Sequence, residues 1–253
     1  MKIQYASDLH LEFRANREWL RENPLEVTGD ILLLAGDIIT FTTNPIIDEN
    51  FWLWCSNNYK KVLVVPGNHE YYRAKLFNLG EDIQWNVMPN VGYYDNKVIR
   101  IEDTDFILST LWSHISSRNG YAIGQSMNDF YEIEYKGKLL TNKDYNMLHE
   151  KSVRFIEKAV KESTAQHIVV VTHHSPSLLT IATEHLTSPL WSAFATDLHC
   201  LMEDGKIDYW VYGHSHTNIN CKVLNTEVVC NQLGYVEHRG QMAGFRLDKY
   251  FEL

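Results

Sequence analysis

Short runs of apolar residues recur along the chain, and each ends in a polar loop. Residues 62–65 read VLVV, a run rich in β-branched side chains that predicts a buried strand. Pro66 and Gly67 follow it and favour a turn. Runs of the same character predict four more strands, at residues 3–6, 31–35, 168–172 and 209–212. Apolar strands that alternate with longer helical stretches are typical of an α/β fold.

Amphipathic stretches between these runs predict helices. The clearest one covers residues 141–163, where Thr141 and Asp144 have the spacing of a capping box. Less regular patterns predict further helices at residues 14–23, 46–59 and 191–204. Residues 76–88 show no clear period and are expected to be helical or irregular.

Strand patterns also occur in pairs. Residues 91–94 and 97–101 flank Asp95 and Asn96 and predict a hairpin, and residues 105–111 predict another strand.

Near the end of the chain, residues 219–224 and 227–231 predict paired strands, and residues 235–247 predict one or two more. A turn at Asn225 and Thr226 would place Cys221 opposite Cys230. Free thiols remain the preferred interpretation of these two cysteines.

Residues 112–140 mix aromatic and polar side chains without a period. Long irregular segments in compact domains often serve as lids or binding loops. We therefore expect one domain over residues 1–253, with a lid-like insertion at about residues 112–140 that covers the functional site.

Composition narrows the class of protein. The chain has 253 residues, 45% of them hydrophobic and 22% charged, and its net charge is −9. These values are ordinary for a globular domain, and the negative balance argues against extended nucleic-acid binding. No apolar run approaches the length of a membrane span, and residues 1–13 lack the apolar segment of a signal peptide. Together these features predict a cytoplasmic protein without membrane association.

The polar residues that follow the five predicted strands share one chemistry. Each loop offers an Asp, an Asn or a His, and the residues concerned are Asp8, His10, Asp37, Asn68, His173, His174, His214 and His216. Carboxylate, amide oxygen and imidazole suit Mn, Fe or Zn, and these loops hold no thiolate. A single loop of this kind has little weight, but five in the same strand-then-ligand context predict a site for two metal ions.

With these motifs the chain resembles the calcineurin-like metallophosphoesterase superfamily. The matching motifs run from residue 8 to residue 216 and are Asp8-x-His10, Gly36-Asp37, Gly67-Asn68-His69-Glu70, His173-His174 and Gly213-His214-x-His216. The resemblance implies a four-layer α/β/β/α sandwich with two mixed β-sheets. It also implies that the metal ions lie at the strand ends between the sheets.

The resemblance assigns a role to each motif. One metal ion would be held by Asp8, His10 and His216. The other would be held by Asn68, His214 and a histidine of the third motif, with Asp37 bridging the two ions. Neighbouring residues on a strand point to opposite faces, so only one of His173 and His174 is expected to be a ligand. We favour His173, and His174 would then line the pocket or support the ligands.

The residues of the loop after the VLVV run have further implied roles. His69 would act as the acid near the leaving group, and Glu70 would fix His69. Tyr71, Tyr72 and Arg73 follow directly and are candidates for a wall that contacts substrate. Packing of the tyrosines and a solvated Arg73 are the alternative interpretation.

The implied activity is hydrolysis of a small phosphate ester, a monoester or a diester. Two divalent ions about 3.5–4 Å apart can clamp the phosphate while a bridging hydroxide attacks phosphorus. Manganese is the preferred metal, and Fe, Zn, Ni and Co also fit these ligands. A cyclic-nucleotide phosphodiesterase, a nuclease and a non-catalytic scaffold that keeps the fold stay open as alternatives. The natural substrate and the oligomeric state are not indicated by the sequence.

Overall fold

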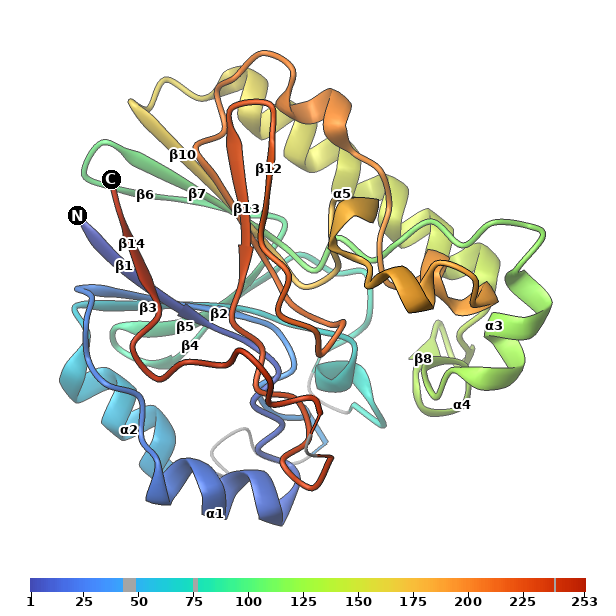
Figure 1. Cartoon of the computed structure of the whole chain (residues 1–253), viewed down its shortest axis with the longest axis horizontal. Coiled ribbons are helices and arrows are strands. Elements are labelled where there is room, and N and C mark those ends of the chain that lie inside the picture. The colour runs from blue at the N-terminus through green and yellow to red at the C-terminus, as the bar shows by residue number, and fades with distance from the viewer. Residues whose placement is uncertain (43–48, 75–76, 239) are drawn as a thin grey trace.

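The computed structural model describes residues 1–42, 49–74, 77–238 and 240–253. Two six-stranded sheets face each other in the described part of the chain (Figure 1). In spatial order the first sheet consists of β14 (Tyr250–Glu252), β1 (Lys2–Ala6), β2 (Ile31–Ala35), β3 (Lys61–Val65), β5 (Val91–Asp95) and β4 (Ile83–Met88). The second sheet consists of β12 (Cys221–Val223), β13 (Thr226–Cys230), β11 (Tyr209–Tyr212), β10 (His167–Thr172), β7 (Thr104–Ser109) and β6 (Lys97–Ile101).

Helices cover the outer faces of the two sheets (Figure 1). The first sheet carries α1 (Arg14–Glu22) and α2 (Glu49–Asn58), and the second carries α5 (Asn142–Glu162). The short helices α3 (Gly120–Ser126) and α4 (Asp129–Glu132) lie at one end with a small hairpin of β8 (Glu134–Tyr135) and β9 (Lys138–Leu139). The predicted four-layer α/β/β/α arrangement is confirmed.

The strands hold the layers together because both of their faces are apolar. Successive side chains of a strand point to opposite sides of the sheet. Ile31 and Leu33 of β2 therefore enter the core between the two sheets, whereas Leu32 and Leu34 enter the core under α2. On the second sheet Val170 packs against the α5 residue Ile156 in a third core.

Inner strands of both sheets end at the same edge of the molecule. β1, β2, β3 and β5 run parallel in the first sheet, and β7, β10, β11 and β13 run parallel in the second. The two edges are joined where Ser7, just after β1, forms a bridge with Gln232, just after β13. The loops that follow these strands are therefore brought together between the sheets.

Several elements agree with the sequence-based expectations. The capping box at Thr141 and Asp144 is present and begins α5. The helices expected at residues 14–23 and 46–59 are α1 and α2, although residues 46–48 lie outside the described residues.

Other expectations were wrong. Residues 83–88 form an antiparallel strand paired with β5 and are not helical. Asp95 and Asn96 do not turn a hairpin, because β5 and β6 belong to different sheets and the chain crosses between the sheets there. The helix expected at residues 191–204 is replaced by 3₁₀ turns at Pro189–Ala193 and His199–Met202.

The C-terminal expectations need two corrections. β12 and β13 do pair, but the register places Cys221 opposite Val228, and both Cys221 and Cys230 are free thiols, as preferred. The described part of residues 235–247 forms turns, and the last strand is β14.

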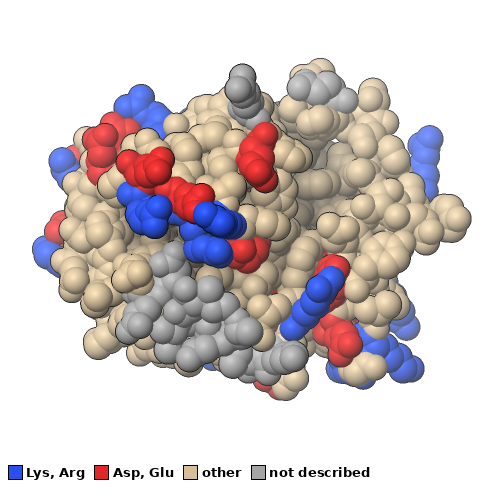
Figure 2. All heavy atoms as spheres, turned by 90° about the horizontal axis from the view of Figure 1, so that it is seen from below, with Lys and Arg blue, Asp and Glu red and all other residues tan. Residues whose placement is uncertain are grey.

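No helix of the described residues has the length and apolar character that a membrane crossing needs. On the face in Figure 2, Lys and Arg side chains lie beside Asp and Glu side chains, and the described residues form no broad basic area there. One such contact joins Arg14 and Glu18 of α1 at 2.7 Å. A cytoplasmic location stays a prediction.

Candidate metal centre

The loops at the strand ends have unusual backbone conformations. Five of the seven candidate ligands have positive φ values, between 47° and 73°, and these are Asp8, His10, Asp37, His214 and His216. Such conformations cost about 1–3 kcal/mol each and persist only when surrounding contacts enforce them. Here the backbone N–H of Asp8 donates to the carbonyl of Gly36 at 2.9 Å, and that of His10 donates to Asp37 at 2.9 Å. The strained loops therefore support one another.

Two glycines let these loops come close enough. A Cβ atom on Gly67 would lie 2.1 Å from Oδ1 of Asp37 and 2.8 Å from Nε2 of His173. A Cβ atom on Gly36, whose φ is +88°, would lie 2.4 Å from Nδ1 of His173. No side chain fits at either position without displacing a candidate ligand.

Four side chains form what we call the His10 group: Asp8, His10, Asp37 and His216. The Nε2 atoms of His10 and His216 lie 2.9 Å apart, and Oδ1 of Asp8 lies 3.3 Å from Nε2 of His216. Each imidazole is oriented through its Nδ1 atom. His10 donates to Oε1 of Glu12 at 3.1 Å, and His216 donates to Oε1 of Gln241 at 2.8 Å. The Nε2 lone pairs consequently face the carboxylates.

Three side chains form the His173 group: Asp37, His173 and His214. Nδ1 of His173 donates to the carbonyl of Ala35 at 2.9 Å, which leaves its Nε2 atom facing Oδ1 of Asp37 at 3.3 Å. Asn68 adjoins this group, with its Oδ1 atom 3.0 Å from the same Nε2. Nε2 of His214 is buried and has no hydrogen-bond partner among the described residues.

These donors fit divalent cations. Buried polar atoms in proteins are nearly always paired, so the unpartnered Nε2 of His214 indicates a missing partner. The converging atoms are carboxylate oxygens, imidazole nitrogens and an amide oxygen, which suit Mn, Fe or Zn. Asp37 belongs to both groups, as a carboxylate that bridges two cations must.

The charges in the centre balance one another. Burial would raise the pKa of Asp37, but the nearby imidazoles of His173 and His69 outweigh burial and hold it well below the ordinary value. Burial lowers the pKa of His10 and of His214, which keeps both rings in the neutral form that binds metal. For His173 the carboxylate of Asp37 outweighs burial and raises the pKa to about 9.

Asn68 is oriented by residues of the 112–140 segment and of its own loop. Its Nδ2 atom donates to Oδ1 of Asp129 at 2.9 Å and to the hydroxyl of Tyr72 at 3.3 Å. The same Oδ1 atom of Asp129 accepts from Tyr72 at 2.6 Å. Because both amide protons point toward these partners, the amide oxygen of Asn68 faces His173.

His69 stands beside the His10 group with its ring fixed on three sides. Nδ1 of His69 donates to Oε1 of Glu12 at 2.9 Å, and its ring stacks on Tyr72 with centroids 4.2 Å apart. Its Nε2 atom lies 3.2 Å from the hydroxyl of Tyr235. Burial would lower the pKa of His69, but the carboxylates of Asp37 and Glu12 outweigh it and raise the pKa to about 9.

We expected the Glu70 side chain to fix His69, but it binds other groups. Its carboxylate accepts from the backbone N–H groups of Gly67 at 2.7 Å, Asp37 at 3.0 Å and Ile38 at 2.9 Å. It therefore ties the loop after β2 to the loop after β3 and holds the backbone of Asp37, whereas Glu12 holds His69.

The two adjacent histidines after β10 differ in what their ring nitrogens meet. His174 is buried, its Nδ1 donates to the carbonyl of Thr110 at 3.3 Å, and its Nε2 accepts from Tyr145 at 2.7 Å. Both nitrogens of His174 thus have protein partners. Nε2 of His173, by contrast, faces Asp37 and Asn68, which are themselves candidate ligands. This favours His173 as the ligand and gives His174 a supporting position.

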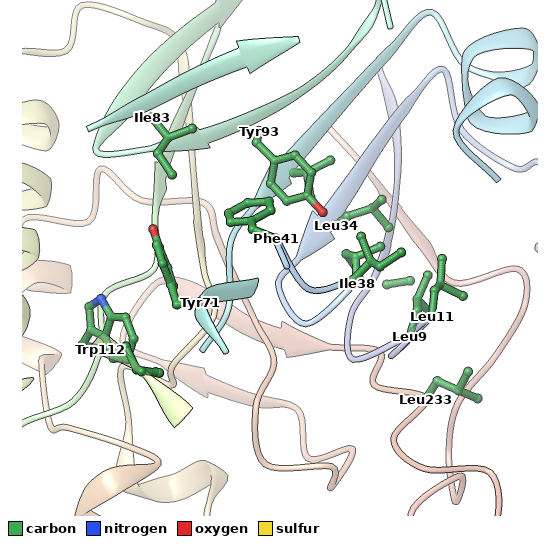
Figure 3. Close-up of a cluster of buried hydrophobic side chains, with 14 of the residues drawn as sticks. Leu9, Leu11, Leu34, Ile38, Phe41, Tyr71, Ile83, Tyr93, Trp112 and Leu233 are labelled. Atoms are coloured by element: carbon green, nitrogen blue, oxygen red, sulfur yellow. The ribbon is translucent and has the colours of Figure 1, made fainter. Parts of the chain in front are cut away.

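Two candidates for a substrate wall lie elsewhere. Tyr71 is buried between Phe41 and Trp112 in the core under the first sheet (Figure 3). Arg73 is exposed and pairs with Glu132. Neither lines the cavity above the centre, whereas Tyr72 does.

Four residues near the centre were not assigned from the sequence: Glu12, Asp129, Tyr235 and Gln241. Glu12 follows His10 by two positions, and this D-x-H-x-E spacing could have indicated that Glu12 lies beside the ligands. Asp129 lies in the irregular segment at residues 112–140, which contains none of the motifs. Tyr235 and Gln241 are far from every motif, and only the fold brings them to the site.

A cavity of about 320 Å³ opens onto the centre. Asp37, His69, His214 and His216 form its floor. Its walls include Tyr72, Met127, Asp129, Phe194 and Tyr235, and none of the described lining residues is Lys or Arg. Residues 126–129 come from the 112–140 segment, so this segment supplies part of the wall. Its movement as a lid stays a prediction.

Comparisons with known proteins identify the family of this chain. The model of a family described as calcineurin-like phosphoesterase matches residues 1–218. An uncharacterized protein of Acanthamoeba polyphaga mimivirus is 30% identical over 264 residues, which cover 94% of this chain and 92% of the viral protein.

Solved structures share the fold. The phosphopantetheinyl hydrolase of Mycobacterium tuberculosis is 17% identical, with a TM-score of 0.70 over 97% of this chain and 94% of that one. The protein TT1561 of Thermus thermophilus is 11% identical, with a TM-score of 0.52 over 91% of this chain and 88% of that one.

Proposed function

The chain belongs to the calcineurin-like phosphoesterase family, and we propose that this metal-dependent hydrolase of phosphate esters uses two divalent cations. Asp8, His10 and His216 would hold one cation. Asn68, His173 and His214 would hold the other, and Asp37 would bind both. The observation that carries the proposal is the position of Asp37 between two groups of converging donors.

The chain's own residues prepare the site for a phosphoryl group. A bound pair of divalent cations would supply an activated water and would neutralise charge on the phosphoryl oxygens. Glu12 and Gln241 orient His10 and His216 so that their Nε2 lone pairs face inward. Asp129 orients the amide oxygen of Asn68 in the same way.

His69 is the proposed proton donor to the leaving oxygen. Glu12 holds its Nδ1 atom, which leaves Nε2 beside Tyr235 on the floor of the cavity. A donor must reach the leaving oxygen within hydrogen-bond distance, and His69 lines the cavity in which the phosphoryl group would be held. The hydroxyl of Tyr235 would position the His69 ring. It can accept a hydrogen bond from Nε2 when the ring is protonated and donate one when the ring is neutral.

The cavity supports a small substrate. Its volume of about 320 Å³ is near the lower end for small-molecule sites. The described lining residues include no Lys or Arg that would hold a chain of phosphates, which disfavours a nuclease. Manganese is the proposed metal, and Fe, Zn, Ni or Co also fit the donors.

A metal-resolved ester screen tests the proposal. The protein is stripped of metal and reloaded with Mn, Fe, Zn, Ni or Co singly, and bound metal is counted. p-Nitrophenyl phosphate, its bis-ester and cyclic nucleotides are then assayed. We expect two bound ions and hydrolysis with at least one metal, and we expect Asp37→Asn to lose both the ions and the activity. Asp103→Asn, at an exposed position, is the matched control.

His69→Ala separates metal binding from proton donation. It should keep both ions and lose rate by about 10²–10⁴-fold with a poor leaving group, since a general acid contributes that much. With p-nitrophenolate, which leaves without a proton, the loss should be small. Two bound ions without hydrolysis of any ester would instead support a scaffold that keeps the fold.

A further inference from the structure

A second cavity of about 220 Å³ lies directly beside the catalytic one. We call it the side pocket. Its walls include Thr180, Ile181, Ala182, Leu190, Trp191 and Phe194. Phe194 and Ser215 line both cavities, so the side pocket is adjacent to the place where the phosphoryl group would sit.

The chemistry of the side pocket differs from that of the metal centre. Its described walls contain no Lys, Arg, Asp or Glu. Five of the ten lining residues are apolar, and the other five are His185 and the hydroxyl residues Thr180, Ser188, Ser215 and Thr217. A cavity of roughly 150 Å³ accommodates benzene in other proteins, so this volume has room for at least one aromatic ring. An uncharged apolar group fits the aliphatic and aromatic side of this pocket, where Ile181, Leu190 and Trp191 lie.

The walls are fixed relative to the candidate ligands. The ring of Phe194 stacks on that of His214, with centroids 4.7 Å apart and planes 28° apart. The carbonyl of Phe194 accepts from the N–H of Ser175, which follows the double histidine, at 3.1 Å. Ser215 lies between His214 and His216 in the sequence. A group in the side pocket would therefore have a defined position relative to a phosphoryl group on the metal ions.

We propose that the side pocket binds an uncharged apolar group of the substrate, about the size of one ring, attached through the phosphate ester. This inference rests on the proposed function, and it defines the substrate class as phosphate esters with an aromatic or branched aliphatic group. The occupant is a part of the substrate and is not a second ligand.

Paired phosphonates that cannot be hydrolysed test the side pocket by binding alone. Manganese-loaded protein is titrated with phenylphosphonate and methylphosphonate in a calorimeter. We expect phenylphosphonate to bind about tenfold more tightly, because only its ring reaches the side pocket. Ala182→Phe fills the pocket and should abolish the difference. Thr183→Phe adds the same side chain at an exposed position outside the pocket and should keep it.

A matched pair of diesters measures the same preference in turnover. Methyl and phenyl p-nitrophenyl phosphate share a leaving group, so their ratio of kcat/KM isolates the second ester group. Wild type should prefer the phenyl ester by about tenfold, and Ala182→Phe should remove that preference. Should Ala182→Phe fail to fold, Trp191→Ala takes away one wall and should weaken the preference.

The outcomes separate this inference from the proposed function. Equal affinities and equal turnover for the two members of each pair would overturn the side pocket and leave the phosphoesterase intact. A preference that survives in Ala182→Phe would also overturn it. If neither phosphonate binds and no ester is hydrolysed, the proposed function fails, and the inference fails with it.

Discussion

The two groups of candidate ligands share Asp37 but are held in different ways. In the His173 group the main contact is with the backbone, because Nδ1 of His173 donates to the carbonyl of Ala35. In the His10 group the contacts are with side chains, because Glu12 holds His10 and Gln241 holds His216. Gln241 also lies beyond residue 218, where the match to the family ends.

This difference bears on how each half of the centre is built. A carbonyl at the end of β2 is in place as soon as the first sheet forms, so the orientation of His173 follows from the sheet. The orientation of His216 requires that the C-terminal segment also docks, as it does through the contact between the N–H of Gly234 and the carbonyl of Asp8 at 3.0 Å. Substitutions that displace Asp37, which both groups share, should weaken metal binding by both groups. Substitutions of a side chain that orients one ligand should weaken metal binding by one group only.

The largest effect is expected from Gly67→Ala, which acts on the shared ligand. The new Cβ atom would lie 2.1 Å from Oδ1 of Asp37, so the carboxylate must move. Both ions should be lost, and kcat/KM should fall by roughly 10³-fold or more, since metal catalysis supplies several kcal/mol. Metal analysis and the ester assay measure the two effects.

The matched control for Gly67→Ala is Gly124→Ala. Gly124 lies in α3, and a Cβ atom there would meet Asn142 at an ordinary 3.8 Å. It should keep metal and activity. A Gly67→Ala protein that is folded by circular dichroism and still binds two ions would show that the tight approach is not required.

Gln241→Ala should affect only the His10 group. It removes the acceptor for Nδ1 of His216, and loss of such an orienting partner typically costs about 10–100-fold in metal affinity. A metal titration should then show one site of unchanged affinity and one weakened site. Gln241→Glu keeps an oxygen acceptor for His216 and should largely restore the affinity of the weakened site in the His10 group. Equal weakening of both sites would contradict the separation of the two groups.

Asp129→Ala tests Asn68, the candidate ligand beside the His173 group that is oriented by side chains. Without Asp129, Nδ2 of Asn68 keeps only the longer contact with Tyr72, and the amide is free to rotate. We expect kcat/KM to fall by about tenfold, at the low end for an orienting partner. Asp129→Asn retains an acceptor at Oδ1 and serves as the control. If Asp129→Ala and Asp129→Asn behave alike, the orientation of Asn68 does not depend on this contact.

The sequence predicted the sheet interiors and the motif loops well because both are local patterns. The apolar run at residues 62–65 predicted a buried strand, and the structure confirms it. Val62 and Val64 face one core, and Leu63 and Val65 face the other. The motif residues are brought together because they all follow strands of shared direction.

The failures arise where tertiary contacts decide. Asp95 and Asn96 resemble a hairpin turn locally, yet the adjoining strands pair with partners in different sheets. Residues 83–88 have a period of two that was obscured by the irregular residues before them. Tyr235 and Gln241 carry no local signal, because their roles depend on a loop that reaches the centre from the end of the chain.

The smallest expected effect on the metal centre comes from a substitution at the crossing between the sheets, away from both groups. Burial raises the pKa of Asp95 to about 6, although its Oδ1 atom accepts from the N–H of Thr110 at 2.8 Å. Because the pKa is raised on folding, the stability associated with the protonated carboxyl is fully present below about pH 4 and is lost as pH rises through about 6. Asp95→Asn keeps the acceptor and removes the charge. It should therefore stabilise the protein at pH 8 by about 1–3 kcal/mol and by less at pH 5.

Urea unfolding at pH 5 and pH 8 measures this difference, with Asp103→Asn as the exposed control. The control should change stability little, because the side chain of Asp103 is exposed. Metal content and kcat/KM should stay unchanged in Asp95→Asn, because neither group of ligands contacts Asp95. A loss of metal from Asp95→Asn would mean that the crossing between the sheets also holds the metal centre in place. The two groups of ligands would then depend on this crossing, contrary to the prediction.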